Sequence, residues 1–321
     1  MTTGFILGKF MPPHKGHVYL CSFAQNYCDD LTILVGTQPN EPIPGDKRFE
    51  WMREMFPAAC VLHMHKTLPQ MPEEHPDFWN IWRKACRDYH PEKIDFLFAS
   101  ESYGYRLAKE LEAQFVPVDI ARSAVPVSAT LIRQDPHRYW AYIPETVRPY
   151  YMKRICLFGP ESTGKSTLAG QLAQHYQTCM VPEYGRTYTE TFGMDCGAAD
   201  LLNIAKGHKA ATAAAIANAR RYLIMDTDAL MTALWAQMLL GKRIAELDAF
   251  SDYADLYLLC DIDVPWEDDG NRYFPDHTRR KEFFELCRRE LDNRKLLYRI
   301  VSGNDRLKTA ITIIDAAFNT K

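Results

Sequence analysis

Short apolar runs alternate with stretches of helical periodicity along the first 118 residues. The apolar runs have the length of buried strands and are bounded by polar or turn-forming residues. They predict strands at residues 5–10, 31–35, 60–64, 94–99 and 115–118. The stretches between them predict helices at residues 17–27, 46–55, 77–89 and 103–114. This alternation is typical of an α/β fold, a parallel sheet with helices on both faces.

The same alternation begins again after a break that is rich in proline and tyrosine. Pro144, Pro149, Tyr150 and Tyr151 interrupt the pattern between residues 142 and 153. Beyond the break, strands are predicted at residues 154–158, 223–226, 256–260 and 298–301, and the alanine-rich stretch 198–219 favours a helix. A chain of 321 residues also exceeds the usual size of one core. We therefore predict two domains, residues 1–148 and 152–321.

Composition narrows the class of protein. Apolar residues make up 47% of the chain and charged residues 25%, as in ordinary globular proteins. A formal charge of −3 argues against a general nucleic-acid binder but is compatible with small anionic substrates. Nine cysteines without a C-x-x-C spacing suit a reducing compartment better than a disulfide framework. With neither a signal-peptide pattern nor an uncharged run long enough to cross a bilayer, we expect a cytoplasmic protein.

A phosphate-binding string lies in the middle of the chain, directly after a predicted strand. Its residues are Gly159-Pro160-Glu161-Ser162-Thr163-Gly164-Lys165-Ser166, followed by Thr167. The string fits G-x-x-x-x-G-K-[ST], the P-loop, in which glycines let backbone N–H groups surround phosphates. Lys165 is expected to neutralise phosphate charge and Ser166 to offer its hydroxyl to Mg²⁺. We assign ATP binding to Gly159, Glu161, Ser162, Thr163, Gly164, Ser166 and Thr167.

Acidic residues follow the strands of this second half. Asp226 ends the run 223–226, and Asp228 comes two residues later. We interpret Asp226 as the metal partner, together with Ser166, and Asp228 as a substrate contact or base. The alternative for either carboxylate is a solvated strand end. Glu183, with its neighbours, is a candidate for holding a sugar hydroxyl or a phosphate.

Two more segments complete the predicted second site. Glu183, Tyr184 and Arg186 lie in the string Val-Pro-Glu-Tyr-Gly-Arg, for which a surface ion pair is the alternative. Residues 266–272 are interpreted as a mobile lid, with Arg272 reaching the transferred phosphate. Trp266 or Tyr273 would stack on a flat base. A surface loop without contacts is the alternative for this segment.

The first predicted strand runs into a string of glycine, proline and histidine. It reads Gly8-Lys9-Phe10-Met11-Pro12-Pro13-His14-Lys15-Gly16-His17. This order resembles the G-x-F-x-P-x-H-x-G-H signature of nucleotidyltransferases, with every fixed position present. His14 and His17, three residues apart at a helix start, can both face a polyphosphate. The alternatives are an exposed helix end and half of a zinc site, although further ligands at zinc spacing are missing nearby.

A second element of that signature is expected after the last strand of the first domain. Val127-Ser128-Ala129-Thr130-Leu131-Ile132-Arg133 resembles I-S-x-T-x-x-R, with valine in place of isoleucine. Ser128 is predicted to cap a helix whose free N–H groups point at phosphate, and Arg133 to reach the same charge. The two strings together predict a Rossmann-like nucleotidyltransferase domain. The string G-x-G-x-x-G is absent, which argues against a dinucleotide-binding dehydrogenase.

Adenylyl transfer of this kind depends on charge and alignment more than on a general base. The attacking phosphate is already ionised at neutral pH. The residues assigned to the triphosphate and the developing pyrophosphate are Lys9, His14, Lys15, His17 and Arg133, with Gly8, Phe10, Ser128 and Thr130 in the same ATP site and Mg²⁺ assisting. Arg48, Trp79 and Trp82 are candidates for holding the acceptor. Core packing is the alternative for the two tryptophans.

These two signatures, in this order, resemble the NadR-type bifunctional proteins, in which a nicotinamide-nucleotide adenylyltransferase is fused to a ribosylnicotinamide kinase. The resemblance covers nearly the whole chain. It implies an N-terminal nucleotidyltransferase domain, a P-loop kinase domain, ATP as co-substrate and Mg²⁺ as cofactor. It also implies a role in NAD biosynthesis and pyridine-nucleotide salvage. The kinase would make nicotinamide mononucleotide (NMN) from nicotinamide riboside, and the transferase would make NAD and pyrophosphate from NMN and ATP.

Several alternatives stay open at this point. Some members of that family carry a helix-turn-helix domain, but this chain begins at the catalytic strand, so nucleic-acid binding is not expected. The same two reactions could act on another vitamin-derived substrate, such as a riboflavin or pantetheine precursor. A protein that senses nucleotides with little turnover, rather than an enzyme, is a further alternative. Homo-oligomers are compatible with the sequence, and a membrane segment is not expected.

Overall fold

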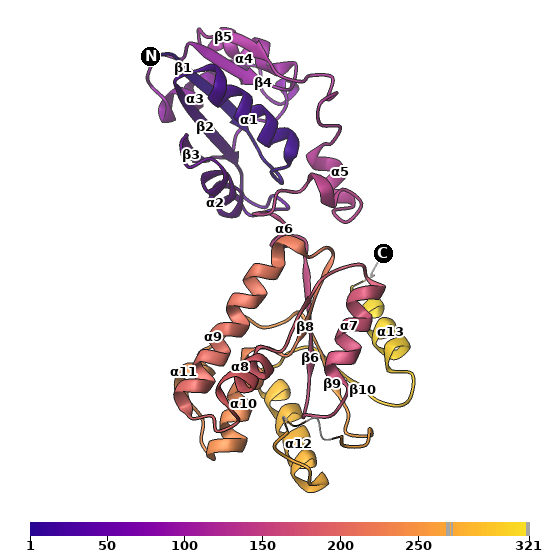
Figure 1. Cartoon of the computed structure of the whole chain (residues 1–321). Helices are drawn as coiled ribbons and strands as arrows, with labels where there is room; N and C mark the ends of the chain where they lie inside the picture. The colour runs from indigo at the N-terminus through magenta and orange to yellow at the C-terminus, as the bar shows by residue number, and fades with distance from the viewer. Residues whose placement is uncertain (268–269, 271, 319–321) are drawn as a thin grey trace. The chain divides into compact units, whose positions relative to one another are not determined.

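The computed structural model describes residues 1–267, Gly270 and residues 272–318, and it shows two compact units, Met1–Tyr150 and Tyr151–Lys321 (Figure 1). Each unit contains one five-stranded parallel sheet with helices between successive strands. The expectation of two α/β folds with parallel sheets is thus confirmed. Among the described residues, the model contains no helix that is both long and apolar enough to cross a membrane.

The sheet of the first unit has the order β3-β2-β1-β4-β5. Its strands are β1 (Thr3–Gly8), β2 (Asp30–Thr37), β3 (Cys60–His65), β4 (Phe96–Ala99) and β5 (Gln114–Pro117). Its helices are α1 (Lys15–Tyr27), α2 (Gly45–Met55), α3 (Phe78–Tyr89), α4 (Tyr103–Glu110), α5 (Ala129–Gln134) and α6 (Arg148–Tyr151), with 3-10 turns at Pro72–Glu74 and Trp140–Tyr142. Successive strands are added on one side of β1 as far as β3, and on its other side from β4 onward. This switch point between β1 and β4 is where open α/β sheets form a binding crevice at the carboxyl ends of the strands.

Both faces of this sheet are buried. On one face, Ile6, Ile33 and Val35 pack with apolar residues of α1 and α2. On the other, the alternate residues Phe5 and Leu34 pack with residues of α3 and α4. This alternation explains why the strands read as nearly continuous apolar runs in the sequence. The carboxyl ends of the strands are left uncovered by these two layers.

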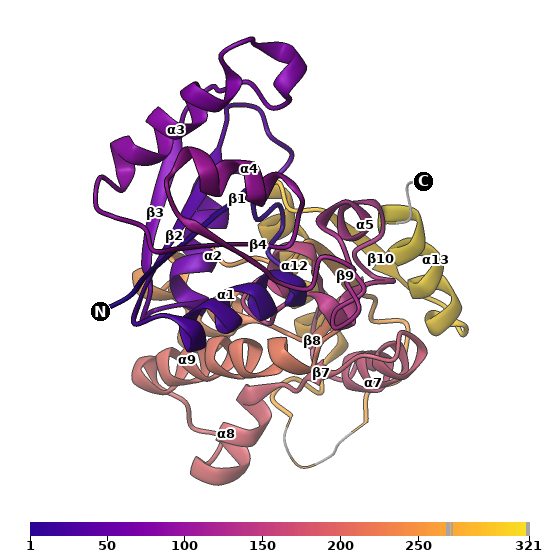
Figure 2. The ribbon, with the colours of Figure 1, turned by 90° about the horizontal axis from the view of Figure 1, so that it is seen from above.

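The second unit has the order β10-β9-β6-β8-β7. Its strands are β6 (Lys153–Phe158), β7 (Met180–Val181), β8 (Tyr222–Asp226), β9 (Leu256–Cys260) and β10 (Tyr298–Val301). Its helices are α7 (Lys165–His175), α8 (Tyr184–Phe192), α9 (Ala198–Ala215), α10 (Ala229–Leu240), α11 (Ala245–Asp248), α12 (His277–Asn293) and α13 (Arg306–Phe318), with a 3-10 turn at Ile216–Asn218. The helices α7 and α13 cover one face of this sheet. In Figure 2, α9 is the long helix next to α8, and α9 also packs against α10 and α11.

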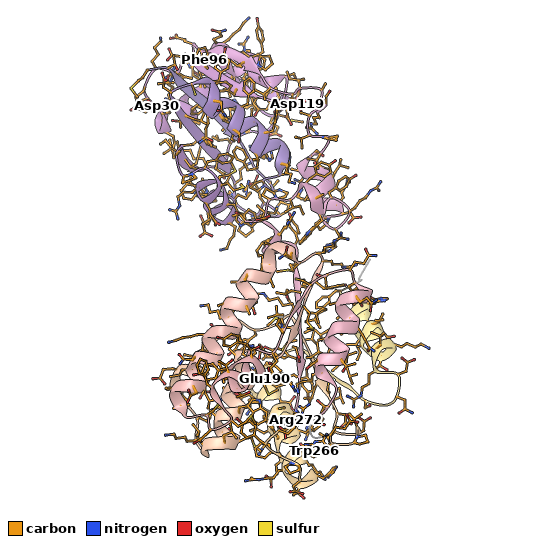
Figure 3. All side chains as sticks on the ribbon, viewed as in Figure 1. Asp30, Phe96, Asp119, Glu190, Trp266 and Arg272 are labelled. Atoms are coloured by element: carbon orange, nitrogen blue, oxygen red, sulfur yellow. The ribbon has the colours of Figure 1, made fainter. Side chains whose placement is uncertain are left out.

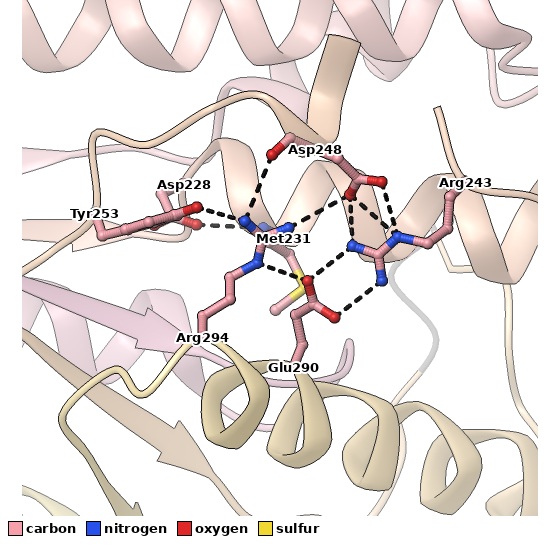
Figure 4. A network of polar contacts seen from close by, with 7 residues as sticks. All are labelled: Asp228, Met231, Arg243, Asp248, Tyr253, Glu290 and Arg294. Atoms are coloured by element: carbon pink, nitrogen blue, oxygen red, sulfur yellow. Dashed lines mark hydrogen bonds and ion pairs between the residues drawn. The ribbon is translucent and has the colours of Figure 1, made fainter. Parts of the chain in front are cut away.

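A network of ion pairs joins three of these helical segments (Figure 4). Glu290 of α12 accepts two hydrogen bonds from Arg243, which follows α10, at 2.8 and 2.9 Å. It also accepts one from Arg294 Nε at 2.6 Å. Both arginines contact Asp248 at the end of α11, and Arg294 also donates to Tyr253. The network therefore ties α12 to the ends of α10 and α11.

Several element boundaries differ from the sequence-based expectation, and the following differences have local reasons. The first strand ends at Gly8 rather than at residue 10, because Phe10 has a left-handed backbone with φ of 47°. The helix α4 ends at Glu110 rather than at residue 114, because Gln114 already pairs with β4 as part of β5. The strand β7 is absent from the prediction, since two residues carry too little pattern. The alanine-rich helix ends at Ala215, before the 3-10 turn.

Candidate active sites

A cavity of the first unit lies at the carboxyl edge of its sheet. It has a volume of about 600 Å³, and its walls include the ends of β1, β2, β3 and β4. The predicted residues that line it are Gly8, Lys9, Phe10, His14, His17, Trp79, Trp82, Ser128, Thr130 and Arg133. The structure therefore brings both signature strings, and both candidate tryptophans, to one cavity.

The two signature histidines are stacked at the start of α1. Their ring centroids are 3.8 Å apart, and the planes differ by 27°. Nδ1 of His14 accepts the backbone N–H of Gly16 at 3.1 Å, and Nδ1 of His17 accepts that of His14 at 3.3 Å. Because a backbone N–H can only donate, each Nδ1 is an acceptor and the ring proton lies on Nε2. Both rings can thus offer an N–H donor to a phosphate oxygen.

Both imidazoles are neutral at neutral pH. Burial, followed by the positive charge of Arg122, lowers the pKa of His14 to about 4. Burial lowers the pKa of His17 well below its ordinary value, and His14 and Arg122 add to this effect. The histidines thus act as neutral hydrogen-bond donors in the ligand-free protein. The positive charge of the site comes from arginine and lysine.

A hydrogen bond joins the two signature strings of the first unit. Arg133 donates to the carbonyl of Met11, which lies 122 positions earlier in the chain, and its second Nη contacts the Thr130 hydroxyl at 3.2 Å. Ser128 caps α5, as predicted from the sequence, because its Oγ accepts the N–H of Leu131 at 3.3 Å. The second string is therefore held against the first by its own arginine.

Two predicted residues of the first unit lie elsewhere. Lys15 is exposed at the start of α1 and is not among the lining residues of the cavity. Arg48 is fully buried, and it donates to the carbonyl of Lys9 at 2.6 Å and to the carboxylate of Glu41. Lys9 itself lies 3.5 Å from Glu41 and lines the cavity. The geometry thus makes Arg48 a support for Lys9 rather than a direct contact for the acceptor.

The two tryptophans both pack on the core and line the cavity. Trp82 donates its Nε1–H to the carbonyl of Pro69 at 2.9 Å, and Trp79 has Arg106 over its ring at 5.8 Å. Both pack against the core formed with α3 and α4. Core packing was the alternative to a role in binding the acceptor. The two tryptophans both pack on the core and face the cavity, so one role does not exclude the other.

Arg122 also lines this cavity, although no motif in the sequence predicts it. It lies in the loop after β5 that contains Asp119, which is labelled in Figure 3. Asp119 holds this loop by accepting the N–H groups of Ser123, Ala124 and Val125. Arg122 also pairs with Glu101 at 3.3 Å. It belongs to neither signature string, so only the folded loop reveals its position.

The phosphate-binding loop of the second unit connects β6 to α7. Gly159 has φ of +126°, and an added Cβ would lie 2.8 Å from the carbonyl oxygen of Cys260, so only glycine fits. Gly164 is the N-cap of α7 and makes no side-chain cap, which leaves the amides of the first helical turn available to an anion. Lys165 and Thr163 both donate to the carbonyl of Pro160, at 2.6 and 2.9 Å. Ser166 and Thr167 are exposed in the first turn of α7.

Two arginines outside the motif brace this loop. Arg280 of α12 donates to the carbonyl of Ser162 at 3.0 Å, and Arg306 of α13 donates to the carbonyl of Thr163. The carboxylate of Glu161, a predicted ATP contact, accepts the N–H groups of Tyr273 and Phe274 at 2.6 to 3.1 Å. The loop therefore also anchors the segment that follows β9.

A cavity of about 70 Å³ lies beside the phosphate-binding loop. The predicted residues that line it are Glu161, Lys165, Glu183, Arg186, Arg272 and Tyr273. The helices α9 and α10 supply a further wall, in which His208, Thr232 and Trp235 were not foreseen from the sequence. Arg186 also pairs with Glu190 at 3.9 Å.

The acidic residues of this unit have different surroundings. Asp226 is 2% exposed, and its Oδ1 has no hydrogen-bond partner among the described residues. Asp228 caps α10 by accepting the N–H of Met231 at 3.2 Å, and its other oxygen accepts the Tyr257 hydroxyl at 2.6 Å. Burial raises the pKa of Glu183 and of Asp228. Of these three carboxylates, Glu183 is the one that lines the cavity.

The predicted lid falls only partly within the described residues. Positions 268, 269 and 271 lie outside them. Trp266 is half-buried with its Nε1 unpaired among the described residues, and it does not line the cavity. Arg272 does line it. Tyr273 lines it too, and its hydroxyl donates to the carbonyl of Met194 at 2.5 Å. Tyr184, half-buried, packs against α9 rather than along the cavity wall.

The two units together place a nucleotidyltransferase signature and a P-loop at the carboxyl edges of two parallel sheets, which defines a two-domain nucleotide-binding protein. Residues 154–306 match the family described as AAA domain. The chain is 30% identical over 327 residues to the trifunctional NAD biosynthesis/regulator protein NadR of Escherichia coli, covering 95% of this chain and 80% of that protein. The NadR of Salmonella typhimurium is also 30% identical, over 88% of this chain and 74% of that protein. The chain therefore belongs to the NadR family of NAD biosynthesis proteins.

Solved structures agree with this fold. A crystal structure of a NadR protein in complex with NR has a TM-score of 0.74 at 22% identity, and the match covers 100% of this chain and 97% of that chain. A second, of a NadR protein in complex with NAD and AMP-PNP, has a TM-score of 0.72 at 23% identity over the same shares of both chains. At these identities the likeness supports the fold of both units.

Proposed function

We propose that this chain catalyses two ATP-dependent steps of NAD biosynthesis. In residues 152–321, the 5′-hydroxyl oxygen of nicotinamide riboside attacks the γ-phosphorus of ATP, giving NMN and ADP. In residues 1–148, a phosphate oxygen of NMN attacks the α-phosphorus of a second ATP, giving NAD and pyrophosphate. The observation that carries this proposal is the convergence of both signature strings on one cavity, through the hydrogen bond from Arg133 to Met11, in a chain of the NadR family.

The first site supplies donors and positive charge for the transfer of an adenylyl group. His14 and His17 offer Nε2–H donors, and Lys9, Arg122 and Arg133 offer charge around the same cavity. Pyrophosphate leaves as the new bond to the α-phosphorus forms, so charge accumulates on oxygens that these groups can reach. No side chain has to remove a proton, because the phosphate of NMN is already ionised. Trp79 and Trp82 provide flat apolar surface for the nicotinamide or adenine ring.

The second site supplies a phosphate cradle and a carboxylate. The amides at the start of α7 and the ammonium of Lys165 bind the triphosphate. The 5′-hydroxyl proton has to be accepted as the hydroxyl attacks. Two carboxylates line the cavity, Glu161 and Glu183, and Glu161 already accepts the N–H groups of Tyr273 and Phe274. Asp228, whose two oxygens already accept hydrogen bonds, holds α10 and Tyr257 in place. We therefore assign the base role to Glu183 rather than to Asp228.

The residues of the second unit also fit a magnesium ion. Oδ1 of Asp226 is buried and unpaired among the described residues, at the end of β8, and the hydroxyl of Ser166 is exposed at the start of α7. A hard cation prefers carboxylate and hydroxyl oxygens of this kind. Asp226 and Ser166 would hold Mg²⁺, which would neutralise phosphate charge when bound. At the first site, we propose that Mg²⁺ arrives bound to the phosphates of ATP.

Product analysis tests both activities at once. The chain is incubated with nicotinamide riboside and Mg-ATP, and NMN, NAD, ADP and pyrophosphate are quantified over time. Lys165→Ala is expected to abolish phosphorylation of the riboside and to spare NAD formation from supplied NMN, and His17→Ala to do the reverse. Loss of both reactions in either variant, with the fold intact by circular dichroism, contradicts the division of labour.

The same assay separates the alternatives. A nucleotide sensor would bind ATP and NAD without steady-state formation of NAD. An enzyme for another vitamin-derived substrate would form ADP with a riboflavin or pantetheine precursor and not with nicotinamide riboside. Either result would replace the proposed function.

A further inference from the structure

The side chain of Glu161, in the phosphate-binding loop, is bonded to the backbone of a distant segment. Its Oε1 accepts the N–H groups of Phe274 and Tyr273 at 2.6 and 3.1 Å, and its Oε2 accepts that of Tyr273 at 2.9 Å. Glu161 is only 5% exposed. The two N–H groups belong to residues 112 and 113 positions later in the chain. The carboxylate therefore connects the phosphate-binding loop to the residues just before α12.

The charge of Glu161 does not help this loop to bind a triphosphate. The amides at the start of α7 and the ammonium of Lys165 attract phosphate, whereas a nearby carboxylate repels it. Arg280, which is 3% exposed, donates to the carbonyl of Ser162 in the same loop. Burial lowers the pKa of Arg280, and the charge of Glu161 acts in the opposite direction, so the two groups balance each other in part. Holding the distant segment explains a carboxylate here better than binding phosphate does.

The segment that Glu161 holds forms part of the cavity beside the phosphate-binding loop. Tyr273 lines this cavity, and its hydroxyl donates to the carbonyl of Met194, between α8 and α9, at 2.5 Å. Cys196, in the same connection, lines the cavity as well. Tyr273 is thus bonded at its backbone to the phosphate-binding loop and at its hydroxyl to the connection between α8 and α9. It bridges two segments that both border the cavity.

The next residue links this bridge to a second aromatic side chain of the cavity. Phe274 stacks on Trp235 of α10, with ring centroids 5.7 Å apart and an angle of 12° between the planes. Tyr273 contacts the same indole at 5.4 Å, and Phe283 of α12 packs on it edge-on at 4.7 Å. Trp235 also lines the cavity. Tyr273 and Trp235, which we call the aromatic wall, therefore depend on the backbone that Glu161 holds.

We propose that Glu161 is a positioning residue of the second site, which fixes the aromatic wall against which the riboside binds. This inference rests on the proposed kinase function. The phosphate-binding loop keeps its bonds from Arg280 and Arg306 when Glu161 is changed, so the cradle for ATP stays in place. Loss of the bonds to residues 273 and 274 displaces the aromatic wall instead. A misplacement of about 1 Å can cost about a hundredfold in rate, so the effect is measurable.

Three substitutions separate the reach of this side chain from its charge. Glu161→Gln can keep an oxygen at the place of Oε1, which accepts both N–H groups, but it loses the charge. Glu161→Asp keeps the charge and is one methylene too short, and Glu161→Ala loses both. In the alanine and aspartate variants, kcat/KM for nicotinamide riboside is expected to fall about tenfold or more, chiefly through KM. In the glutamine variant it should fall less than about threefold. A general base or metal ligand at this position would give the opposite order, because only aspartate keeps a carboxylate.

The nucleotide side of the same reaction is the second readout. The KM for ATP and the equilibrium binding of ADP should each change less than about threefold in all three variants, because the loop keeps its amides and Lys165. Glu282→Gln is the matched control on α12, where Glu282 makes an exposed pair with Arg279 at 3.1 Å. It is expected to leave the KM for either substrate unchanged. NAD formation from NMN reports on the first unit.

Each outcome decides the question. Equal losses in the glutamine and alanine variants, or ADP binding that weakens as much as riboside use in a chain folded by circular dichroism, overturn the positioning role and leave the kinase function standing. An alanine variant with wild-type kinetics does the same. If the alanine variant does not fold, the comparison of glutamine with aspartate carries the test. A wild type that does not phosphorylate nicotinamide riboside overturns the proposed function and this inference together.

Discussion

Replacing Glu290 with glutamine removes the centre of the ion-pair network in Figure 4. The carboxylate accepts three hydrogen bonds, two from Arg243 and one from Arg294, and its side chain is only 7% exposed. A glutamine of nearly the same shape keeps one acceptor oxygen but turns its other terminal group into a donor that faces arginine N–H groups. The substitution is therefore expected to loosen the attachment of α12 to the ends of α10 and α11.

The magnitude follows from the pKa of this carboxyl group. Hydrogen bonds from Arg243, followed by those from Arg294, lower the pKa of Glu290 from 4.5 to about 2, although burial acts in the opposite direction. At about 1.4 kcal/mol for each pH unit this gives about 3 kcal/mol. Screening at the partly exposed Arg243 reduces it to about 2–3 kcal/mol. Because the folded pKa is the lower one, the contribution is complete above about pH 4.5 and is lost as the pH falls toward 2.

Amide hydrogen exchange of α12, followed by mass spectrometry at pH 7, measures this free energy within one unit of a two-domain chain. Glu290→Gln is expected to speed exchange of α12 peptides about 30- to 150-fold. Glu285→Gln is the matched control on the same helix, because Glu285 makes an exposed pair with Arg288 and its loss should change exchange less than about threefold. Equal effects of the two substitutions would refute the reasoning.

Three further predictions concern the sites. In NMR titrations the imidazoles of His14 and His17 are expected to show no protonation between pH 5.5 and 8, because burial lowers both pKa values, and a midpoint near 6.5 for either would contradict this. Arg133→Ala should lower kcat/KM for NMN adenylylation about a hundredfold and leave riboside phosphorylation unchanged, as measured by product analysis. Gly207→Ala should destabilise the α9 wall of the second site by about 1–3 kcal/mol, because its Cβ would lie 2.0 Å from Cε1 of Tyr184, and unchanged amide hydrogen exchange of α9 would argue against that contact.

The sequence was sufficient for the parts of each site that depend on backbone conformation. Glycine in the phosphate-binding loop and serine at the start of α5 have local roles, so their spacing alone predicts a loop and a helix start. The apolar runs likewise predicted nine of the ten strands, because both faces of a parallel sheet are buried. These features need no knowledge of distant residues.

Residues that reach a site from distant elements were not predictable in this way. Arg280 and Arg306 brace the phosphate-binding loop from α12 and α13, but in the sequence they look like ordinary residues of charged helices. His208 lies in an alanine-rich helix that was interpreted as a packing element. The sequence places Arg48 beside a helix start, where its complete burial under Lys9 is not visible. Each of these roles depends on tertiary contacts across the sheet.

The two sites differ in how a helix N-terminus becomes a site for phosphate. At α7 the cap is a glycine without a side-chain bond, so the backbone amides themselves remain available, and Lys165 adds the charge. At α1 the imidazole of His14 already accepts the N–H of Gly16, and that of His17 accepts the N–H of His14. These two backbone N–H groups are thus already hydrogen-bonded, and the donors that remain for a phosphate are the Nε2–H groups of the two histidines. The first site therefore depends on its histidine side chains for a function that the second site obtains from its backbone.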